Sequence, residues 1–321
     1  MDINTKDLDI TGEISLQDQT NTPPIQPKIK KTKREKFDAF VERRMTKKVW
    51  PILVPFFIVM IVLIIIPIIS VVIYSIIEPT GNITLFKFNL DNFMKFLTNS
   101  SLVWMLILSI LLALVASLIS VLIAYPLAYI LSTLKSKFAA RNIWLLVTMP
   151  IWVNMILKSI GLQSFFHLIG GNMLGTQFAV IVGMVYMFLP FAVAPIYNAL
   201  EGQDPLYVQA ALDLKASKLR AFREITLRHS MPGVITAFSL VLIQSATSLL
   251  IVRYMGDGKI TLITSIIESY FTQGTNFGFG AAISIVLAIL IFIIILLSNL
   301  LSKKFEEGKK KKWKDSFSQV I

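Results

Sequence analysis

The chain has 321 residues, of which 55% are apolar and only 16% are charged, and its mean hydropathy is +0.70. Soluble domains carry about a quarter charged residues, so this composition excludes an ordinary soluble domain and indicates a membrane protein. The net charge of +12 does not indicate nucleic-acid binding, because the cations gather in the tails and in alternate loops, as expected beside anionic lipid. The chain has no Cys, which excludes a disulfide framework, a thiolate metal site and a Cys nucleophile.

The N-terminal region, residues 1–48, is polar and combines three prolines with a basic cluster. Such a segment buries too little apolar surface to fold alone, so we expect a largely disordered tail. The long polar stretch before the first apolar run is untypical of a secretory signal, and we expect that run to be retained as a membrane helix. The basic composition of residues 303–321 predicts a second tail, which anchors the chain at the inner leaflet. Nucleic-acid binding by this tail is a minor alternative.

Long apolar runs fill the region between the tails, residues 49–302. A helix needs about 20 apolar residues to cross a bilayer, and prolines are tolerated within such helices. The runs that meet this length predict spans over approximately 50–77, 102–134, 142–162, 178–200, 231–252 and 280–302. The expected fold class is therefore an all-α integral membrane protein with six transmembrane helices.

The distribution of Lys and Arg predicts how these spans are oriented. Of the 31 cationic residues, 26 lie in the two tails and in the loops 133–143 and 201–230. These segments would all lie on one side of a six-helix topology. Because cytoplasmic loops carry an excess of Lys and Arg, we expect both termini to be cytoplasmic.

The segment 201–230 is the one long charged stretch between apolar runs. Asp204 followed by Pro205 predicts a helix start, because Asp accepts hydrogen bonds at the N-cap and Pro fits the first helical position. The helix should end near Lys215, and Ser217 can cap a second helix with an apolar face that includes Phe222. The pattern predicts two short helices joined by a tight turn along the membrane surface. An ordinary amphipathic loop resting on lipid is the alternative.

This stretch resembles the EAA loop of binding-protein-dependent ABC importer permeases, whose pattern is E-A-A-x-D-L-G-A-S, then Phe, Leu-Pro and Pro-Gly. Here it reads Gln209-Ala210-Ala211-Leu212-Asp213-Leu214-Lys215-Ala216-Ser217, then Phe222, Leu227-Arg228 and Pro232-Gly233. Gln209, Lys215 and Arg228 depart from the pattern. The departure at Lys215 implies strain, because Gly normally supplies a positive φ at that turn.

Further motifs resemble the spermidine/putrescine permease branch, and together they cover roughly residues 50–302. They read Leu90-Asp91-Asn92-Phe93, Tyr125-Pro126-Leu127-Ala128-Tyr129, Met149-Pro150-Ile151-Trp152-Val153-Asn154, Leu189-Pro190-Phe191, Pro195-Ile196-Tyr197 and Phe277-Gly278-Phe279-Gly280-Ala281-Ala282. The resemblance implies the fold of type I ABC importer permeases (MetI-like) and a multi-pass protein of the bacterial inner membrane. Polyamines are the implied substrate, and importers of other small solutes remain an alternative.

The same resemblance implies the partners. The chain would form half of a translocation pore beside a second, homologous permease, with a cytoplasmic ATPase dimer and an extracytoplasmic substrate-binding protein. ATP and Mg²⁺ would be used by the ATPase subunit, and this chain would bind no cofactor. The residues expected to couple to the ATPase are Asp204, Gln209, Ala210, Ala211, Asp213, Lys215, Ala216, Ser217 and Phe222.

Catalytic motifs are absent from the sequence. It contains no G-x-x-x-x-G-K-[ST] phosphate loop, no H-E-x-x-H zinc motif and no G-x-S-x-G elbow. The histidines, His167 and His229, are isolated from each other and are expected on opposite sides of the membrane. We therefore expect a non-catalytic subunit without a metal site, rather than a membrane-embedded enzyme.

Polar and aromatic residues within the spans are the candidates for a translocation path, because polar side chains prefer the interior of a helix bundle. They are Trp152, Asn154, Tyr186, Asn198, Gln244 and Ser245. The aromatic side chains could hold an organic cation, whereas hydrogen bonding between helices is the alternative role. A stand-alone ion-coupled carrier, the remaining functional alternative, would predict inverted repeats or acidic residues within the membrane, and the sequence shows neither.

Overall fold

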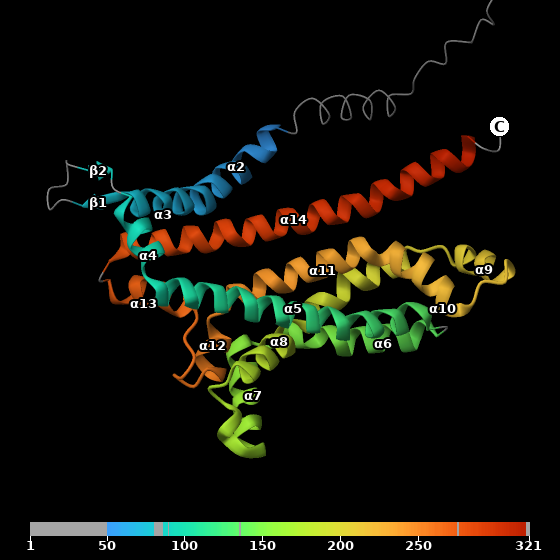
Figure 1. The fold of residues 1–321 in the computed structure, drawn as a ribbon, viewed down its shortest axis with the longest axis horizontal. Helices are drawn as coiled ribbons and strands as arrows, with labels where there is room; N and C mark the ends of the chain where they lie inside the picture. Colours follow the sequence, from blue (N-terminus) through green and yellow to red (C-terminus); the bar gives the residue numbers. More distant parts are fainter. Residues whose placement is uncertain (1–49, 80–85, 89, 135, 275, 319–321) are drawn as a thin grey trace, which may run out of the picture. The chain divides into compact units, whose positions relative to one another are not determined.

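The computed structural model describes residues 50–79, 86–88, 90–134, 136–274 and 276–318 (Figure 1). The predicted tail over residues 1–48 lies outside these residues. Among the described helices, those long and apolar enough to cross a membrane are Leu53–Ile76, Ser100–Thr133, Gln177–Glu201, Lys218–Ala246 and Phe277–Leu301. A sharply bent pair of helices raises the number from five to six if the pair counts as one span. The all-α membrane architecture expected from the sequence is confirmed.

The chain divides into two compact units, Met1–Leu63 and Ile64–Ile321. The described part of the first unit consists of helix α2 (Trp50–Met60), which contains Pro55, and the beginning of the π-helical turn η1 (Ile61–Ile65). The second unit starts within that turn and contains all the remaining elements. It alone carries the site described below.

The second unit opens with α3 (Ile66–Ile76), which leads into a small antiparallel hairpin of β1 (Ile77–Pro79) and β2 (Phe86–Phe88). The register pairs Ile77 with Phe88. Helix α4 (Asp91–Thr98) follows, and α3 packs along the last helix, α14 (Phe277–Ser318). The hairpin, α3, α4 and the beginning of α14 lie together at one end of the unit (Figure 1).

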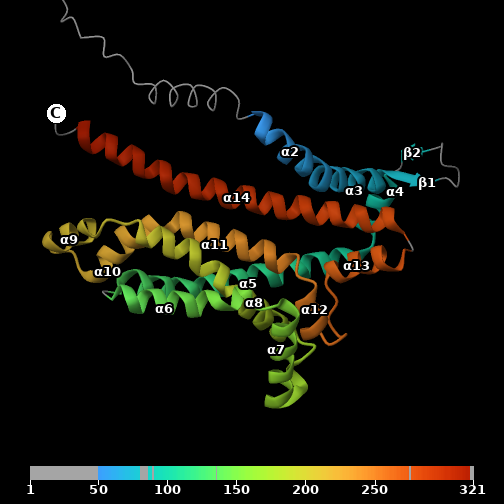
Figure 2. The same ribbon diagram turned by 180° about the vertical axis from the view of Figure 1, so that it is seen from behind.

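The core of the unit is formed by α5 (Ser100–Thr133), α8 (Gln177–Glu201) and α11 (Arg228–Ala246), which pack against one another (Figures 1 and 2). Small residues permit their close approach. Helix α5 buries alanines and serines along its length, and an ideal Cβ on Gly233 of α11 would lie only 2.6 Å from the carbonyl oxygen of Pro195 in α8. Small residues at the contact between helices are typical of membrane proteins, where close packing replaces the hydrophobic driving force.

The third span differs from its prediction. Instead of a span over 142–162, the structure has α6 (Lys137–Thr148), a 3-10 turn η2 (Met149–Trp152) and α7 (Met155–Gly170), with the two halves bent by 98°. Pro150 lacks the N–H that a continuous helix requires, Val153 is extended, and the side chain of Asn154 accepts from the N–H of Ile156 and so starts a new helix. Hydropathy identified an apolar stretch but not this break.

The fifth span also differs from its prediction over 231–252. The helix begins at Lys218, as α10 (Lys218–Ala221), continues through a π-helical turn η4 (Phe222–Leu227) into α11, and ends at Ala246. Hydropathy marks where a helix enters the membrane, whereas backbone hydrogen bonding continues through charged residues, so the helix is longer than its apolar part. Shorter helices follow, α12 (Leu250–Met255) and α13 (Ile263–Gln273), and α14 likewise extends beyond residue 302.

Candidate functional site

The segment singled out by the sequence, residues 204–223, folds into two helices that project from one end of the unit (Figure 1). We call it the helical hairpin. Its first helix is α9 (Pro205–Asp213), and the carboxylate of Asp204 accepts a hydrogen bond of 3.0 Å from the N–H of Leu206. The predicted N-cap, with Pro in the first helical position, is therefore confirmed.

The turn of the hairpin is a Schellman motif centred on Lys215. Two hydrogen bonds close it, from the N–H of Lys215 to the carbonyl of Leu212 (2.9 Å) and from the N–H of Ala216 to the carbonyl of Ala211 (3.0 Å). Lys215 adopts a φ of 61°, the left-handed conformation that Gly adopts without strain. The turn geometry expected at this position is thus formed even though Lys replaces Gly.

The second helix of the hairpin starts immediately after the turn. The hydroxyl of Ser217 accepts from the N–H of Arg220 at 3.3 Å, which confirms the second predicted cap. The sequence predicted this helix as a separate element, but it continues into α11 without interruption. The second helix of the hairpin and the core helix α11 are therefore one continuous helical segment.

Phe222 attaches the base of the hairpin to α5. Its ring meets Tyr129 edge-on at a centroid distance of 5.3 Å and Tyr125 at 6.0 Å. The hydroxyl of Tyr125 also lies 2.9 Å from the hydroxyl oxygen of Ser230 in α11. Sequence periodicity predicted an apolar face for Phe222 but not these partners, because they are about 95 residues away in the chain. The contacts fix the hairpin to two core helices.

The outer surface of the hairpin exposes large apolar side chains. Leu214 is 85% exposed, Leu219 76% and Leu206 64%. Of the two central alanines, Ala210 is exposed whereas Ala211 is half-buried. Gln209 and Asp213 are exposed, and Ala216 is half-buried. Several large exposed apolar side chains on one charged segment are typical of a surface that another protein covers.

The proposed path residues do not form a single cluster. Tyr186 and Asn198 are both exposed on α8 but are about 18 Å apart along its axis, as the helical rise requires. Trp152 is 88% exposed at the bend after α6, and the side chain of Asn154 is used to cap α7. Gln244 is half-buried, whereas Ser245 is buried and its hydroxyl has no hydrogen-bond partner among the described residues.

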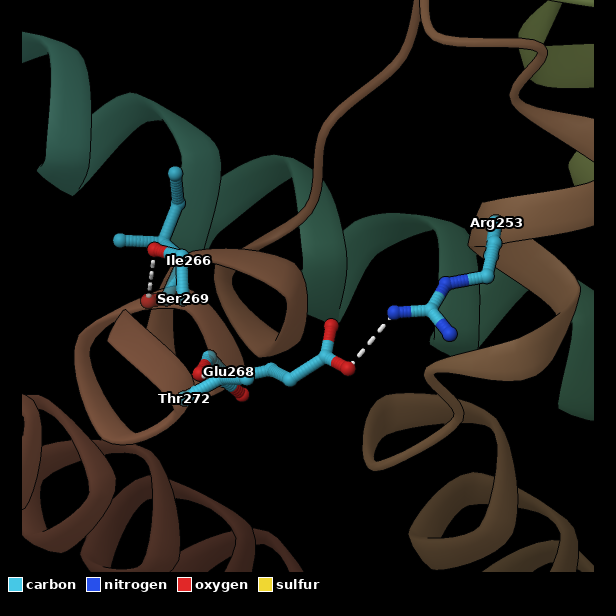
Figure 3. A network of polar contacts seen from close by, with 5 residues as sticks. All are labelled: Arg253, Ile266, Glu268, Ser269 and Thr272. Atoms are coloured by element: carbon cyan, nitrogen blue, oxygen red, sulfur yellow. Dashed lines mark hydrogen bonds and ion pairs between the residues drawn. The ribbon is translucent and has the colours of Figure 1, made fainter. Parts of the chain in front are cut away.

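An ion pair that the sequence analysis missed joins α12 to α13 at the other end of the unit. The guanidinium of Arg253 lies 2.6 Å from the carboxylate of Glu268, and Figure 3 shows the two side chains reaching toward each other between the helices. Next to it, the hydroxyl of Thr272 donates to the carbonyl of Glu268. Opposite charges separated by 15 residues carry no local pattern, so only the tertiary structure identifies the pair.

Curated relatives of this chain include spermidine/putrescine permeases. No family model matches the chain. The chain is 32% identical over 180 residues to the spermidine/putrescine transport system permease protein PotB of Haemophilus influenzae, and 34% identical over 180 residues to PotB of Escherichia coli. Each alignment covers 50% of this chain, and they cover 63% and 66% of the relatives, just under two thirds of their length. A PotB homolog of Mycoplasma pneumoniae is 26% identical over 162 residues, covering 47% of this chain and 55% of that protein.

Solved structures share the fold. A chain of a bacterial ABC transporter involved in the import of the polysaccharide alginate superposes with a TM-score of 0.62 at 16% identity, covering 82% of this chain and 98% of the other. A chain of the MetNI methionine ABC transporter gives a TM-score of 0.52 at 19% identity, covering 65% of this chain and 99% of the other. The chain is a multi-pass membrane protein with the MetI-like fold of ABC importer permeases, and in sequence it is a relative of the bacterial spermidine/putrescine permeases.

Proposed function

We propose that this chain is the permease subunit of an ATP-driven importer and forms half of a translocation pore. The observation that carries this proposal is the helical hairpin, whose exposed apolar surface lies at the end of a helix continuous with the core. The relatives and the fold support the class of transporter. The uneven distribution of Lys and Arg supports an orientation with both termini and the hairpin in the cytoplasm.

In this proposal the hairpin is the docking element for a cytoplasmic ATPase subunit. Leu206, Tyr207, Ala210 and Leu214 would form the contact surface, since all of them are exposed. The apolar surface gives affinity, and the small side chain of Ala210 allows close approach. Of the residues that the sequence predicts to couple to the ATPase, we propose the exposed ones as direct contacts. Half-buried Ala211 is less available for such a contact than exposed Ala210.

Coupling would work as rigid-body transmission. The caps at Asp204 and Ser217 and the turn at Lys215 make the hairpin a compact unit. Phe222 and the continuous helix attach it to α5 and α11. When the ATPase subunits close, a push on the hairpin would rotate these core helices, since packed helices move as units rather than deform.

The remaining parts of the importer would come from other chains. A second permease would complete the pore, a substrate-binding protein would deliver the solute, and ATP and Mg²⁺ would be used in the ATPase subunits without a cofactor on this chain. Two neighbours in fold come from ABC transporters, and an alginate transporter structure related to the first holds a bound periplasmic protein, which supports this division in general.

Polyamines are the proposed substrate, and the similarity to spermidine/putrescine permeases supports them. The exposed aromatic side chains Trp152 and Tyr186 offer ring faces to an organic cation. Asn154, Asn198, Gln244 and Ser245 remain the proposed polar positions along the path. Ser245 is buried, and its hydroxyl, which has no hydrogen-bond partner among the described residues, keeps the capacity to accept one.

The docking surface is tested by Ala210→Glu, with Gln209→Glu as the matched control. Both changes add one carboxylate to an exposed position of α9, but the control restores the residue type of the EAA pattern. We expect Ala210→Glu to reduce ATP-driven spermidine uptake by the reconstituted importer at least tenfold, because burying an unpaired charge in the contact costs more than 1.4 kcal/mol. Uptake in Gln209→Glu should stay at or above the wild-type rate.

The amount of ATPase subunit retained on affinity-purified permease distinguishes docking from damage. We expect Ala210→Glu to lose the ATPase while the chain remains inserted in the membrane. Normal uptake and normal ATPase retention in Ala210→Glu would overturn the docking assignment. Uptake that persists after ATP depletion but stops when the ion gradient is collapsed would overturn the importer class itself.

A further inference from the structure

A cavity of about 550 Å³ lies beside the π-helical turn, next to the hairpin. It is lined by Arg223, Glu224, Ile225 and Arg228. A π-helical turn is wound more widely than an α-helical one, so positions 223 and 228, five residues apart, come closer to the same side of the helix. The turn therefore brings two guanidinium groups to one cavity. A regular α-helix would place these positions on different faces, because five residues exceed one turn of 3.6.

The charge in this cavity is positive. Glu224 is already engaged, since its carboxylate lies 3.1 Å from the Nε of Arg220 in an exposed pair. Neither Arg223 nor Arg228 forms an ion pair with another of the described residues, and both are exposed. Among the described residues, the carboxylate at this cavity is that of Glu224, and it is paired with Arg220 rather than with either of these two arginines. Arginine presents a planar fork of donors that matches the oxygens of a phosphate group.

The cavity lies where the apolar part of a candidate membrane span begins. Arg228 is followed by 24 residues without Asp, Glu, Lys or Arg, and these include the apolar part of the span Lys218–Ala246. The arginines therefore occupy the level where the lipid headgroups begin. Half-buried Ile225 forms an apolar wall beside them, which suits the glycerol and upper acyl chain of a lipid.

We infer that this cavity binds the phosphate of an anionic phospholipid, with Arg223 and Arg228 as its ligands. The depth of the site favours a lipid over an acidic segment of a soluble partner, which would have to enter the headgroup layer. Arg228 is one of the positions at which the sequence departs from the EAA pattern, so the site is a feature of this chain. The inference does not depend on the proposed transport function and requires only that the helix enters the membrane.

The experiment counts bound lipids on the purified full-length chain by native mass spectrometry. Wild type is compared with a double variant, Arg223→Gln with Arg228→Gln, and with the control Lys218→Gln, which removes an exposed charge from the same helix outside the cavity. With phosphatidylglycerol as the probe, we expect the double variant to retain about one lipid fewer per chain and to bind about tenfold more weakly, because two charge-assisted contacts are lost. The control should match wild type.

Further measurements identify the source of the bound phosphate and distinguish loss of the site from misfolding. Glu224→Gln should strengthen phosphatidylglycerol binding, because it removes the negative charge from the cavity; a misfolded chain would not show this gain. Zwitterionic phosphatidylcholine and soluble glycerol phosphate should not displace the bound lipid. Equal lipid counts in wild type and the double variant would overturn the inference. Preferential binding of glycerol phosphate over phosphatidylglycerol would also overturn it. A double variant that keeps its lipid but loses an acidic partner subunit would overturn it as well.

Discussion

Lys215 is held in a left-handed backbone conformation, which residues with a Cβ disfavour. Glycine usually destabilises a folded protein, but replacing Lys215 by Gly should stabilise it. A residue with a Cβ in the left-handed region costs about 1–2 kcal/mol, and φ at this position is 61°. Gly removes that cost, but the unfolded chain with Gly loses more conformational entropy on folding, which costs about 0.5–1 kcal/mol. Lys215→Gly should therefore stabilise the turn by about 0.5–1 kcal/mol.

The local stability of the turn can be measured by amide hydrogen exchange of the folded protein, read out on a proteolytic peptide that covers the turn. We expect the amides of Lys215 and Ala216, which close the Schellman motif, to exchange about two- to fivefold more slowly in the variant. Lys218→Gly is the matched control, because it makes the same substitution and loses the same charge in a helical conformation. We expect amide exchange to be faster in the Lys218→Gly control than in wild type. Faster exchange in both variants would refute the assignment of strain to Lys215.

Two further substitutions test how the hairpin and the core are held. Phe222→Ala should lower the unfolding temperature of the purified protein in detergent, because two edge-on ring contacts worth about 0.5–1.5 kcal/mol each are lost; an unchanged transition would contradict the anchoring role. Gly233→Ala should also destabilise, since the gain of about 1 kcal/mol in helix propensity is smaller than the clash with the fixed carbonyl of Pro195. Gly161→Ala in α7 meets nothing within 4 Å and should be neutral or stabilising; equal losses in both glycine variants would rule out the packing explanation.

Local chemistry made parts of the hairpin predictable. Asp204 and Ser217 each accept a hydrogen bond from an amide two or three residues away, so neighbouring residues alone specify these caps. The turn at Lys215 could be located from the comparison with Gly in a family pattern. The role of the hairpin in coupling remains a proposal, because it concerns a surface whose partner is another chain.

Features that depend on distant residues could not be predicted in this way. The rings that Phe222 contacts, and the pair of Arg253 with Glu268, depend on how separate helices pack. The convergence of Arg223 and Arg228 depends on a π-helical turn, which leaves no periodic signature in so short a segment. The candidate path residues were chosen as polar or aromatic residues within apolar runs, and the structure distributes them over η2, the start of α7, α8 and α11.

By itself the sequence determined the membrane class, and it predicted approximate spans and the position of the charged hairpin. Apolar length and the chemistry of helix caps are properties of contiguous residues, and they act before any long-range contact forms. Only the tertiary structure decided that two helices meet at a sharp bend around residues 153–154 and that the second helix of the hairpin is continuous with α11. Hydropathy measures the preference of a segment for lipid, whereas helix continuity depends on backbone hydrogen bonds and on the packing of neighbouring helices.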